Sequence, residues 1–170
     1  MKHAVARKQP NSKMCLVCGL KNPHSLLTSF YELANGELVG LFSAREEHQS
    51  YPGRLHGGII TALLDETIGR AIMIAHGEIW GVTVEFTTRY LKPVPLDTEL
   101  RVVGRIVNDE GRVFAGTGEL LLPNGDVAAT GVGKYVKLPI ERIADFDVEA
   151  QEWRVVAAPG DPAEVDTTSR

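Results

Sequence analysis

Cysteine is scarce in this sequence. Only Cys15 and Cys18 occur among 170 residues, which is too few for a disulfide framework and half of the four ligands of a typical structural zinc site. His24 offers a third ligand, but no fourth lies nearby in the sequence. We therefore expect ordinary buried or redox-quiet thiols at these positions, and no metal.

The sequence also lacks a long uninterrupted apolar run and an excess of positive charge. The apolar segment 57–75 contains Asp65, Glu66 and Arg70, and these charges interrupt it before it reaches the roughly 18 residues of a membrane span. A net charge of −4 argues against nucleic acid as the main partner. The basic N-terminus carries no apolar secretory segment, so we expect a cytoplasmic protein that binds neither membrane nor nucleic acid.

Length and composition indicate a single domain with tails. A chain of 170 residues, 44% of them hydrophobic, can bury one sizeable core. We assign 1–14 to a flexible N-terminal tail and 15–138 to the folded domain. The acidic remainder, 139–170, is expected to form a short helix followed by a disordered end.

Alternation and turn residues predict two strands, one helix and then four strands. The expected strands are 25–33, 38–44, 79–91, 99–107, 112–122 and 127–138, and the expected helix is 57–75. Short turn-rich connections between the later strands favour sequential antiparallel neighbours. The helix is apolar on nearly every face and needs cover on most of its circumference. We therefore predict an α+β fold in which a curved antiparallel sheet wraps around one long central helix.

The helix begins with His56-Gly57-Gly58, where Ser, Thr, Asp or Asn would usually cap the first turn. Its backbone N–H groups are thus expected to stay available, and glycine lets another molecule approach closely. The helix dipole favours negative charge at this end. These features are typical of an oxyanion site, although a Gly-Gly pair can also serve only tight packing at a corner.

Asp65 and Glu66 differ in their helical neighbours. Glu66 lies four residues before Arg70, which predicts an ion pair on the helix surface. Asp65 has no basic residue three or four positions away. An unpaired, partly buried carboxylate can gain basicity and act as a general base or nucleophile, whereas the structural alternative is contact with a hydroxyl group or a partner chain.

The spacing of Gly57 and Asp65 predicts a dimer. Eight residues correspond to about 12 Å along a helix, while one reacting carbonyl needs donor and base each within roughly 3 Å. One helix cannot easily supply both groups. Two helices can, with Gly57 of one subunit facing Asp65 of the other.

The HGG motif, with a carboxylate eight residues after its first glycine on the only long helix, resembles the hotdog-fold acyl-CoA thioesterases of the phenylacetyl-CoA and 4-hydroxybenzoyl-CoA thioesterase superfamily. The resemblance covers about residues 15–138. It implies a homodimer or dimer of dimers with sites at the interface, acyl-CoA as the substrate and no other cofactor. Gly57 would polarise the thioester carbonyl, Asp65 would be base or nucleophile, His56 would shape the helix start, and Thr83 would position water or the carboxylate.

Several further residues are assigned to substrate binding. Relatives often carry Asn or Gln about seven residues before the HGG glycine, where this chain has Ser50 beside Gln49, and either side chain can hold a water. Gly58 belongs to the helix start. Arg89 and Lys92, or alternatively Lys134 and Lys137, are expected near the phosphates of coenzyme A, although solvated strand-edge charges explain each of them equally simply.

Two other functions are compatible with the expected fold. Hydratases and dehydratases of this fold use a His together with an acid. His48 is the candidate here, but Ala62 stands fourteen residues later, where a dehydratase of the fatty-acid type has Glu; otherwise His48 is a solvated loop residue. The second alternative is a non-catalytic acyl-CoA sensor, in which Asp65 would have no purpose.

Overall fold

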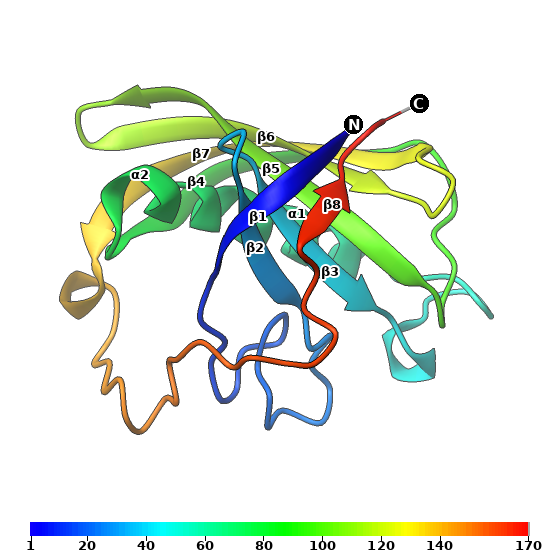
Figure 1. The fold of residues 1–170 in the computed structure, drawn as a ribbon, viewed down its shortest axis with the longest axis horizontal. Coiled ribbons are helices and arrows are strands. Elements are labelled where there is room, and N and C mark those ends of the chain that lie inside the picture. Colours follow the sequence, from blue (N-terminus) through cyan, green and yellow to red (C-terminus); the bar gives the residue numbers. More distant parts are fainter. Residues whose placement is uncertain (170) are drawn as a thin grey trace.

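The computed structural model describes residues 1–169 and contains eight strands and two helices (Figure 1). The strands are β1 (Lys2–Lys8), β2 (Ser29–Leu33), β3 (Leu38–Ser43), β4 (Ile79–Tyr90), β5 (Glu99–Glu110), β6 (Val113–Leu121), β7 (Val127–Pro139) and β8 (Glu164–Asp166). The helices are α1 (Gly57–Ala71) and α2 (Met73–His76), and two 3-10 turns, η1 and η2, cover Glu46–His48 and Ile140–Arg142.

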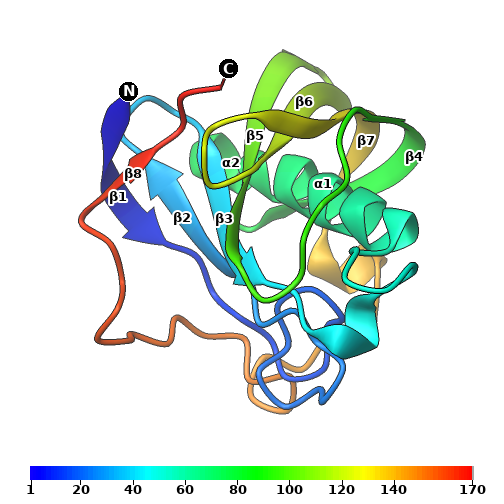
Figure 2. The same cartoon turned by 90° about the vertical axis from the view of Figure 1, so that its right-hand side faces the viewer.

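The strands form one antiparallel sheet in the order β4-β7-β6-β5-β3-β2-β1-β8. Figure 2 shows α1 lying along the concave side of this curved sheet. Ile60, Leu63, Leu64 and Ile68 of α1 are each at most 4% exposed, because the sheet covers the apolar face of the helix. The predicted fold, a curved antiparallel sheet around one long helix, is confirmed.

Glycines let the sheet approach α1 closely. A Cβ atom on Gly116 would lie 2.5 Å from Ile68 Cγ2, and one on Gly104 would lie 3.0 Å from the Thr67 carbonyl oxygen. A side chain at Gly116 would therefore overlap with the helix. The glycines of β5 and β6 have no side chain on the inner face of the sheet, so the sheet can wrap tightly around the helix.

The three strands β5, β6 and β7 are sequential antiparallel neighbours as expected. β4, for which the sequence predicts no neighbour, pairs with β7, and β5 pairs with β3. The connection after β4 contains Pro93 and Pro95, which do not fit a tight hairpin. It crosses the start of α1 instead, where Leu55 N–H donates to the Val94 carbonyl. As a consequence, Thr83 on β4 stands opposite Tyr135 on β7.

Both chain ends add strands beyond the predicted 15–138 domain. β1 lies within the segment expected to be a flexible tail and pairs with both β2 and β8. In the C-terminal segment the expected helix is only the 3-10 turn η2, and the expected disordered end contains β8. β1 and β8 each contain few apolar residues and are stabilised by pairing with strands far away in the sequence, so a local pattern does not predict either strand.

The end of the central helix is close to its predicted position. α1 stops at Ala71, and α2 continues to His76, after which Gly77 takes a positive φ of 60°. Glycine adopts this backbone conformation without a side-chain clash, as expected for a helix C-terminus. Within residues 1–169, neither helix has the length and hydrophobicity to cross a membrane.

Candidate functional site

The start of α1 is capped by a side chain that the sequence analysis did not predict as a cap. His56 Nδ1 accepts a hydrogen bond of 2.9 Å from Gly58 N–H. The Ile59 and Ile60 N–H groups reach the His56 carbonyl oxygen. The expectation that the whole first turn stays available is therefore wrong for Gly58, because its donor is already used.

Gly57 keeps its donor. Within residues 1–169 no hydrogen bond takes up the Gly57 N–H. Its carbonyl accepts a 2.9 Å bond from the Tyr90 hydroxyl, and Thr61 Oγ1 lies 2.8 Å from the same hydroxyl. Tyr90 comes from the exposed end of β4 and was not predicted as a site residue. The arrangement fixes the first turn while leaving one backbone donor at its positive end.

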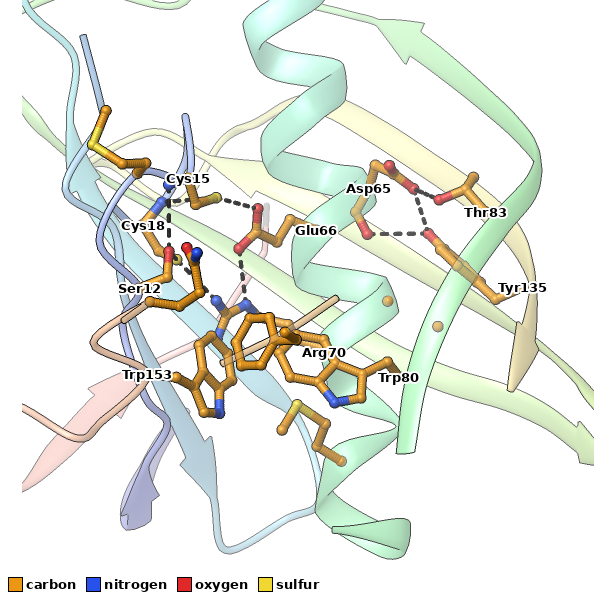
Figure 3. Close-up of a pocket in the computed structure, with 16 residues that line it drawn as sticks. Ser12, Cys15, Cys18, Asp65, Glu66, Arg70, Trp80, Thr83, Tyr135 and Trp153 are labelled. Carbon is orange, nitrogen blue, oxygen red and sulfur yellow. Dashed lines mark hydrogen bonds and ion pairs between the residues drawn. The ribbon is translucent and has the colours of Figure 1, made fainter. Parts of the chain in front are cut away.

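Asp65 points from α1 toward two hydroxyl groups of the sheet (Figure 3). Its Oδ1 accepts a 2.8 Å hydrogen bond from Thr83 Oγ1 and a 3.1 Å bond from the Tyr135 hydroxyl. Oδ2 accepts none from residues 1–169. Asp65 and Thr83 are both predicted from the sequence as site residues, and the structure brings them together. Tyr135 was not predicted, because it faces Thr83 only through the pairing of β4 with β7.

The pKa of Asp65 is raised above its ordinary value, mainly by burial and in part by the Glu66 charge, although hydrogen bonds from Thr83 and Tyr135 act in the opposite direction. The carboxylate loses water without gaining a cation, which disfavours its charged form. This agrees with the predicted gain in basicity. Tyr135 is buried, and its ring stacks on Phe114 at a centroid distance of 4.7 Å, so its hydroxyl is held in place for the carboxylate.

A pocket of about 440 Å³ opens beside Asp65. Thr83 and Tyr135 line it together with Asp65, and an apolar wall is formed by Met14, Met73, Trp80, Phe146 and Trp153. The Trp80 and Trp153 rings lie 4.6 Å apart. Phe146 and Trp153 belong to the C-terminal segment, which therefore builds part of the pocket in addition to extending the sheet.

Glu66 pairs with Arg70 as predicted, but the pair is not on the surface. Arg70 Nε donates a 2.9 Å hydrogen bond to Glu66 Oε1, and the Arg70 side chain is only 6% exposed. Arg70 Nη2 also lies 2.9 Å from Cys18 Sγ, and the Cys15 thiol donates to Glu66 Oε2 over 3.2 Å. The surface interpretation of this pair is thus wrong, because the loop carrying both cysteines covers it.

The two thiols have opposite electrostatic environments. The hydrogen bond between them raises the pKa of Cys15, and burial and the nearby Glu66 carboxylate add to that effect. The same hydrogen bond lowers the pKa of Cys18, with the Arg70 guanidinium acting in the same direction. Cys15, Cys18 and Glu66 place their ligand atoms within 4.8 Å of one another. His24, the third ligand considered from the sequence, is not in this group.

Ser50 and Gln49 lie on the exposed loop before α1. Gln49 Oε1 accepts a 3.2 Å hydrogen bond from Gly53 N–H, and Ser50 N–H donates to the Arg54 carbonyl. Neither of the two lines the pocket beside Asp65 of the same chain. The structure therefore does not bring these predicted water-holding residues to that carboxylate within one subunit.

His48 is buried, and both of its ring nitrogens are occupied. Nδ1 accepts a 2.9 Å hydrogen bond from Arg45 N–H, and Nε2 lies 2.9 Å from the His24 carbonyl, to which it donates. With 2% exposure, His48 is neither a solvated loop residue nor an available catalytic base. It holds the η1 turn in place.

The four basic residues predicted to bind phosphate differ in whether they already form an ion pair. Lys92 forms a 2.7 Å ion pair with Asp126, and Lys134 forms a 2.8 Å pair with Glu85. Lys137 pairs with Asp109. Arg89 is exposed on β4 and makes no ion pair within residues 1–169. Of these four side chains, Arg89 is therefore the most available to an anionic ligand.

Comparison with known proteins finds similarity to thioesterases. Residues 52–129 match the family model described as the thioesterase superfamily. Acyl-coenzyme A thioesterase THEM4 of Rattus norvegicus is 35% identical over 83 residues, which cover 49% of this chain and 35% of the rat protein. The chain spans about a third to a half of the length of the first curated relatives that it matches.

Solved structures agree with the fold. A thioesterase superfamily protein is 27% identical with a TM-score of 0.68, and the match covers 73% of this chain and 63% of that one. A Bacillus halodurans protein solved with CoA is 24% identical with a TM-score of 0.61, over 68% of this chain and 76% of that one. The matched segment 52–129 contains α1 and β4, and with them Gly57, Asp65 and Thr83.

Proposed function

We propose that the protein hydrolyses an acyl-CoA thioester to the free acid and CoA, because residues 52–129 match the family model described as the thioesterase superfamily. The name of the rat relative and the CoA present in the Bacillus halodurans structure support this substrate class. The cytoplasmic location inferred from the sequence remains a prediction.

The observation that carries the proposal is the environment of Asp65. Its Oδ1 is held by Thr83 and Tyr135, Oδ2 is unengaged within residues 1–169, and burial raises its pKa. Acting as a base, Oδ2 would take a proton from water while the oxygen of that water bonds to the thioester carbon. The tetrahedral intermediate would then expel CoA as the thiolate. Direct attack by Oδ2 through an acyl–Asp65 anhydride, later hydrolysed, is the second route.

The carbonyl oxygen gains negative charge in either route. We assign its stabilisation to the Gly57 N–H, a free donor at the positive end of α1. His56 shapes this turn as its cap, and Gly58, whose donor is used by His56, leaves room for the substrate. Tyr90 adds support, since its hydroxyl holds the Gly57 carbonyl.

Gly57 and Asp65 of one chain lie eight residues apart on the same helix, so a complete site needs a second subunit. We infer that two copies pair near β4. This edge strand has 12 residues, and Val84 and Tyr90 on it are 62% and 55% exposed. A long strand edge with exposed apolar side chains is usually covered. Ser50, Gln49, Arg89 and Lys92 would then serve the partner's site, in a dimer or in a dimer of dimers.

The function is tested by a hydrolysis screen over short-chain, medium-chain, long-chain and aryl-CoA esters, without added metal or redox cofactor. We expect release of free CoA from at least one class. The aromatic wall of the pocket favours apolar acyl groups over acetyl-CoA. Tight acyl-CoA binding without turnover across the whole panel would instead support a sensor.

Replacing Thr83 should shift the acidic limb of the pH profile of kcat/KM. Activity needs the Asp65 carboxylate, so kcat/KM should fall on acidification, with an apparent pKa above the ordinary range of aspartate. Thr83→Val removes a hydrogen bond that lowers this pKa, and the acidic limb should move to higher pH. Thr87→Val, on the same strand and with an exposed side chain, is the control. Identical profiles for both variants would contradict the role of Thr83.

A further inference from the structure

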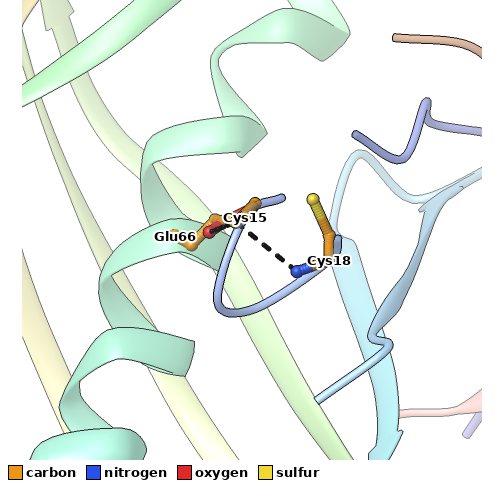
Figure 4. Close-up of side chains that lie close together, drawn as sticks. All are labelled: Cys15, Cys18 and Glu66. Atoms are coloured by element: carbon orange, nitrogen blue, oxygen red, sulfur yellow. Dashed lines mark hydrogen bonds between the residues drawn. The ribbon is translucent and has the colours of Figure 1, made fainter. Parts of the chain in front are cut away.

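The Cys15–Cys18 loop and α1 bring three metal-binding side chains together in the pocket that Asp65 also lines. Figure 4 shows the loop passing beside the turn of α1 that carries Glu66. The two sulfur atoms and a Glu66 oxygen lie within 4.8 Å of one another, and Cys18 is fully buried. Thiolate sulfur and carboxylate oxygen are both common zinc ligands, and a C-x-x-C spacing lets two sulfurs face one ion.

Both sulfur atoms accept hydrogen bonds, as metal-bound thiolates commonly do. Cys15 Sγ accepts hydrogen bonds from the N–H groups of Val17 at 3.3 Å and Cys18 at 3.5 Å. Cys18 Sγ accepts one from Arg70 Nη2 at 2.9 Å. Donors of this kind orient ligating groups and stabilise their charge. They come from the backbone and from a buried arginine, so they are fixed by the fold.

The charge balance of this cluster matches a divalent cation. Two thiolates and the Glu66 carboxylate would carry three negative charges. Arg70, the cation in contact with them, supplies one positive charge. A divalent ion balances the remaining two, so that no net charge is left in a largely buried place.

We propose that Cys15, Cys18 and Glu66 bind a zinc ion. Three protein ligands leave a fourth position, and since all three residues line the pocket, water can fill it. The inference departs from the sequence-based expectation of no metal, because the third ligand is Glu66 of α1 and not the neighbouring His24. Binding releases the thiol protons to solvent. The ion would fasten the loop to α1 one residue after Asp65.

Metal analysis of the untagged protein, purified under reducing conditions with zinc in the growth medium, tests this site. We expect about one zinc per chain in the wild type, and less than about a tenth of that in the Cys15→Ser/Cys18→Ser variant. His24→Ala is the matched control and should keep its zinc. Glu66→Gln should lower zinc affinity roughly tenfold or more in competition with a chromophoric chelator.

A spectrum of the wild type keeps the test decisive if the cysteine variant does not fold. Replacing the ion with Co²⁺ should give thiolate-to-cobalt charge-transfer absorption and the intense visible bands of a tetrahedral site. The proposal is overturned if the wild type carries no zinc and Co²⁺ produces no such absorption. This outcome overturns the proposal both if the two thiols are free and if they form a disulfide. A disulfide would be detected as a protein mass lower by two hydrogens. Thioesterase activity does not enter either readout, so the site is tested independently of the proposed function.

Discussion

Asp65→Asn is expected to lower kcat by roughly 100-fold or more, the scale expected when a positioned acid–base group is lost. The amide keeps the size of the side chain and can still accept from Thr83 and Tyr135, which now hold Oδ1. It loses the basic oxygen that would take the proton from water or attack the thioester. Turnover at saturating substrate separates this loss of chemistry from a loss of binding.

The stability of Asp65→Asn should change in the opposite direction from its activity. Folding raises the pKa of Asp65 because of burial, so the ionised group opposes folding. That cost is absent at low pH and appears as the pH rises through the unfolded and then the folded pKa. At neutral pH the neutral amide should therefore leave the melting temperature unchanged or raise it.

Asp97→Asn is the matched control for this change. Asp97 is exposed in the loop before β5, and its positive φ of 53° suits asparagine. It should retain near-wild-type turnover. Glu66→Gln, the obvious neighbour, is unsuitable because Glu66 contacts both Arg70 and Cys15. Near-normal turnover in Asp65→Asn would show that Asp65 is neither the general base nor the nucleophile.

Arg70→Met is expected to destabilise the protein by about 3–5 kcal/mol, the cost of removing one partner from a buried ion pair. The guanidinium contacts Glu66, Cys18 and the Pro10 carbonyl, and it packs over the Phe30 ring at 4.4 Å. Methionine keeps much of the length but leaves the Glu66 charge without its cation.

Urea unfolding measures this difference. Arg154→Met is the control, since the Arg154 side chain is 68% exposed and 3.9 Å from Glu152, and an exposed pair of this kind contributes less than about 1 kcal/mol. Equal small losses in both variants would show that the pair behaves as the surface contact expected from the sequence.

The sequence predicts local features of this fold well and long-range ones poorly. The Asn35-Gly36 turn between β2 and β3 and the Gly77 helix end depend on local backbone preferences, and both glycines have a positive φ. β1 was missed because its pairing partners include β8, more than 150 residues away. The pairing partner of β4 cannot be predicted from a local pattern, because the connection with two prolines carries the chain over the helix before the next strand begins.

The same distinction applies to the site. Gly57 and Asp65 were identified from spacing on one helix, and Thr83 from the resemblance to thioesterases. Tyr135 was missed because only the β4–β7 register places it against Asp65. The Cys15–Glu66 contact joins residues 51 positions apart. An alternating strand pattern that points a tyrosine inward was the one available signal for Tyr135, and it does not name the partner.

A subunit-mixing experiment tests the shared site most directly. It combines Asp65→Asn with Gly57→Pro, which removes the Gly57 N–H. Proline suits the first position of a helix, and His56 before it has the extended backbone, with ψ of 134°, that proline requires. Each variant alone should be nearly inactive.

Random reassembly of the two variants should make half of the dimers mixed, and each mixed dimer has one site with both groups intact. We therefore predict recovery to about a quarter of wild-type turnover. A Gly57→Pro/Asp65→Asn double variant mixed with Asp65→Asn has no intact site and should stay inactive. No recovery in the first mixture, with mixed dimers demonstrated by mass spectrometry, would contradict a site shared between Gly57 of one subunit and Asp65 of the other.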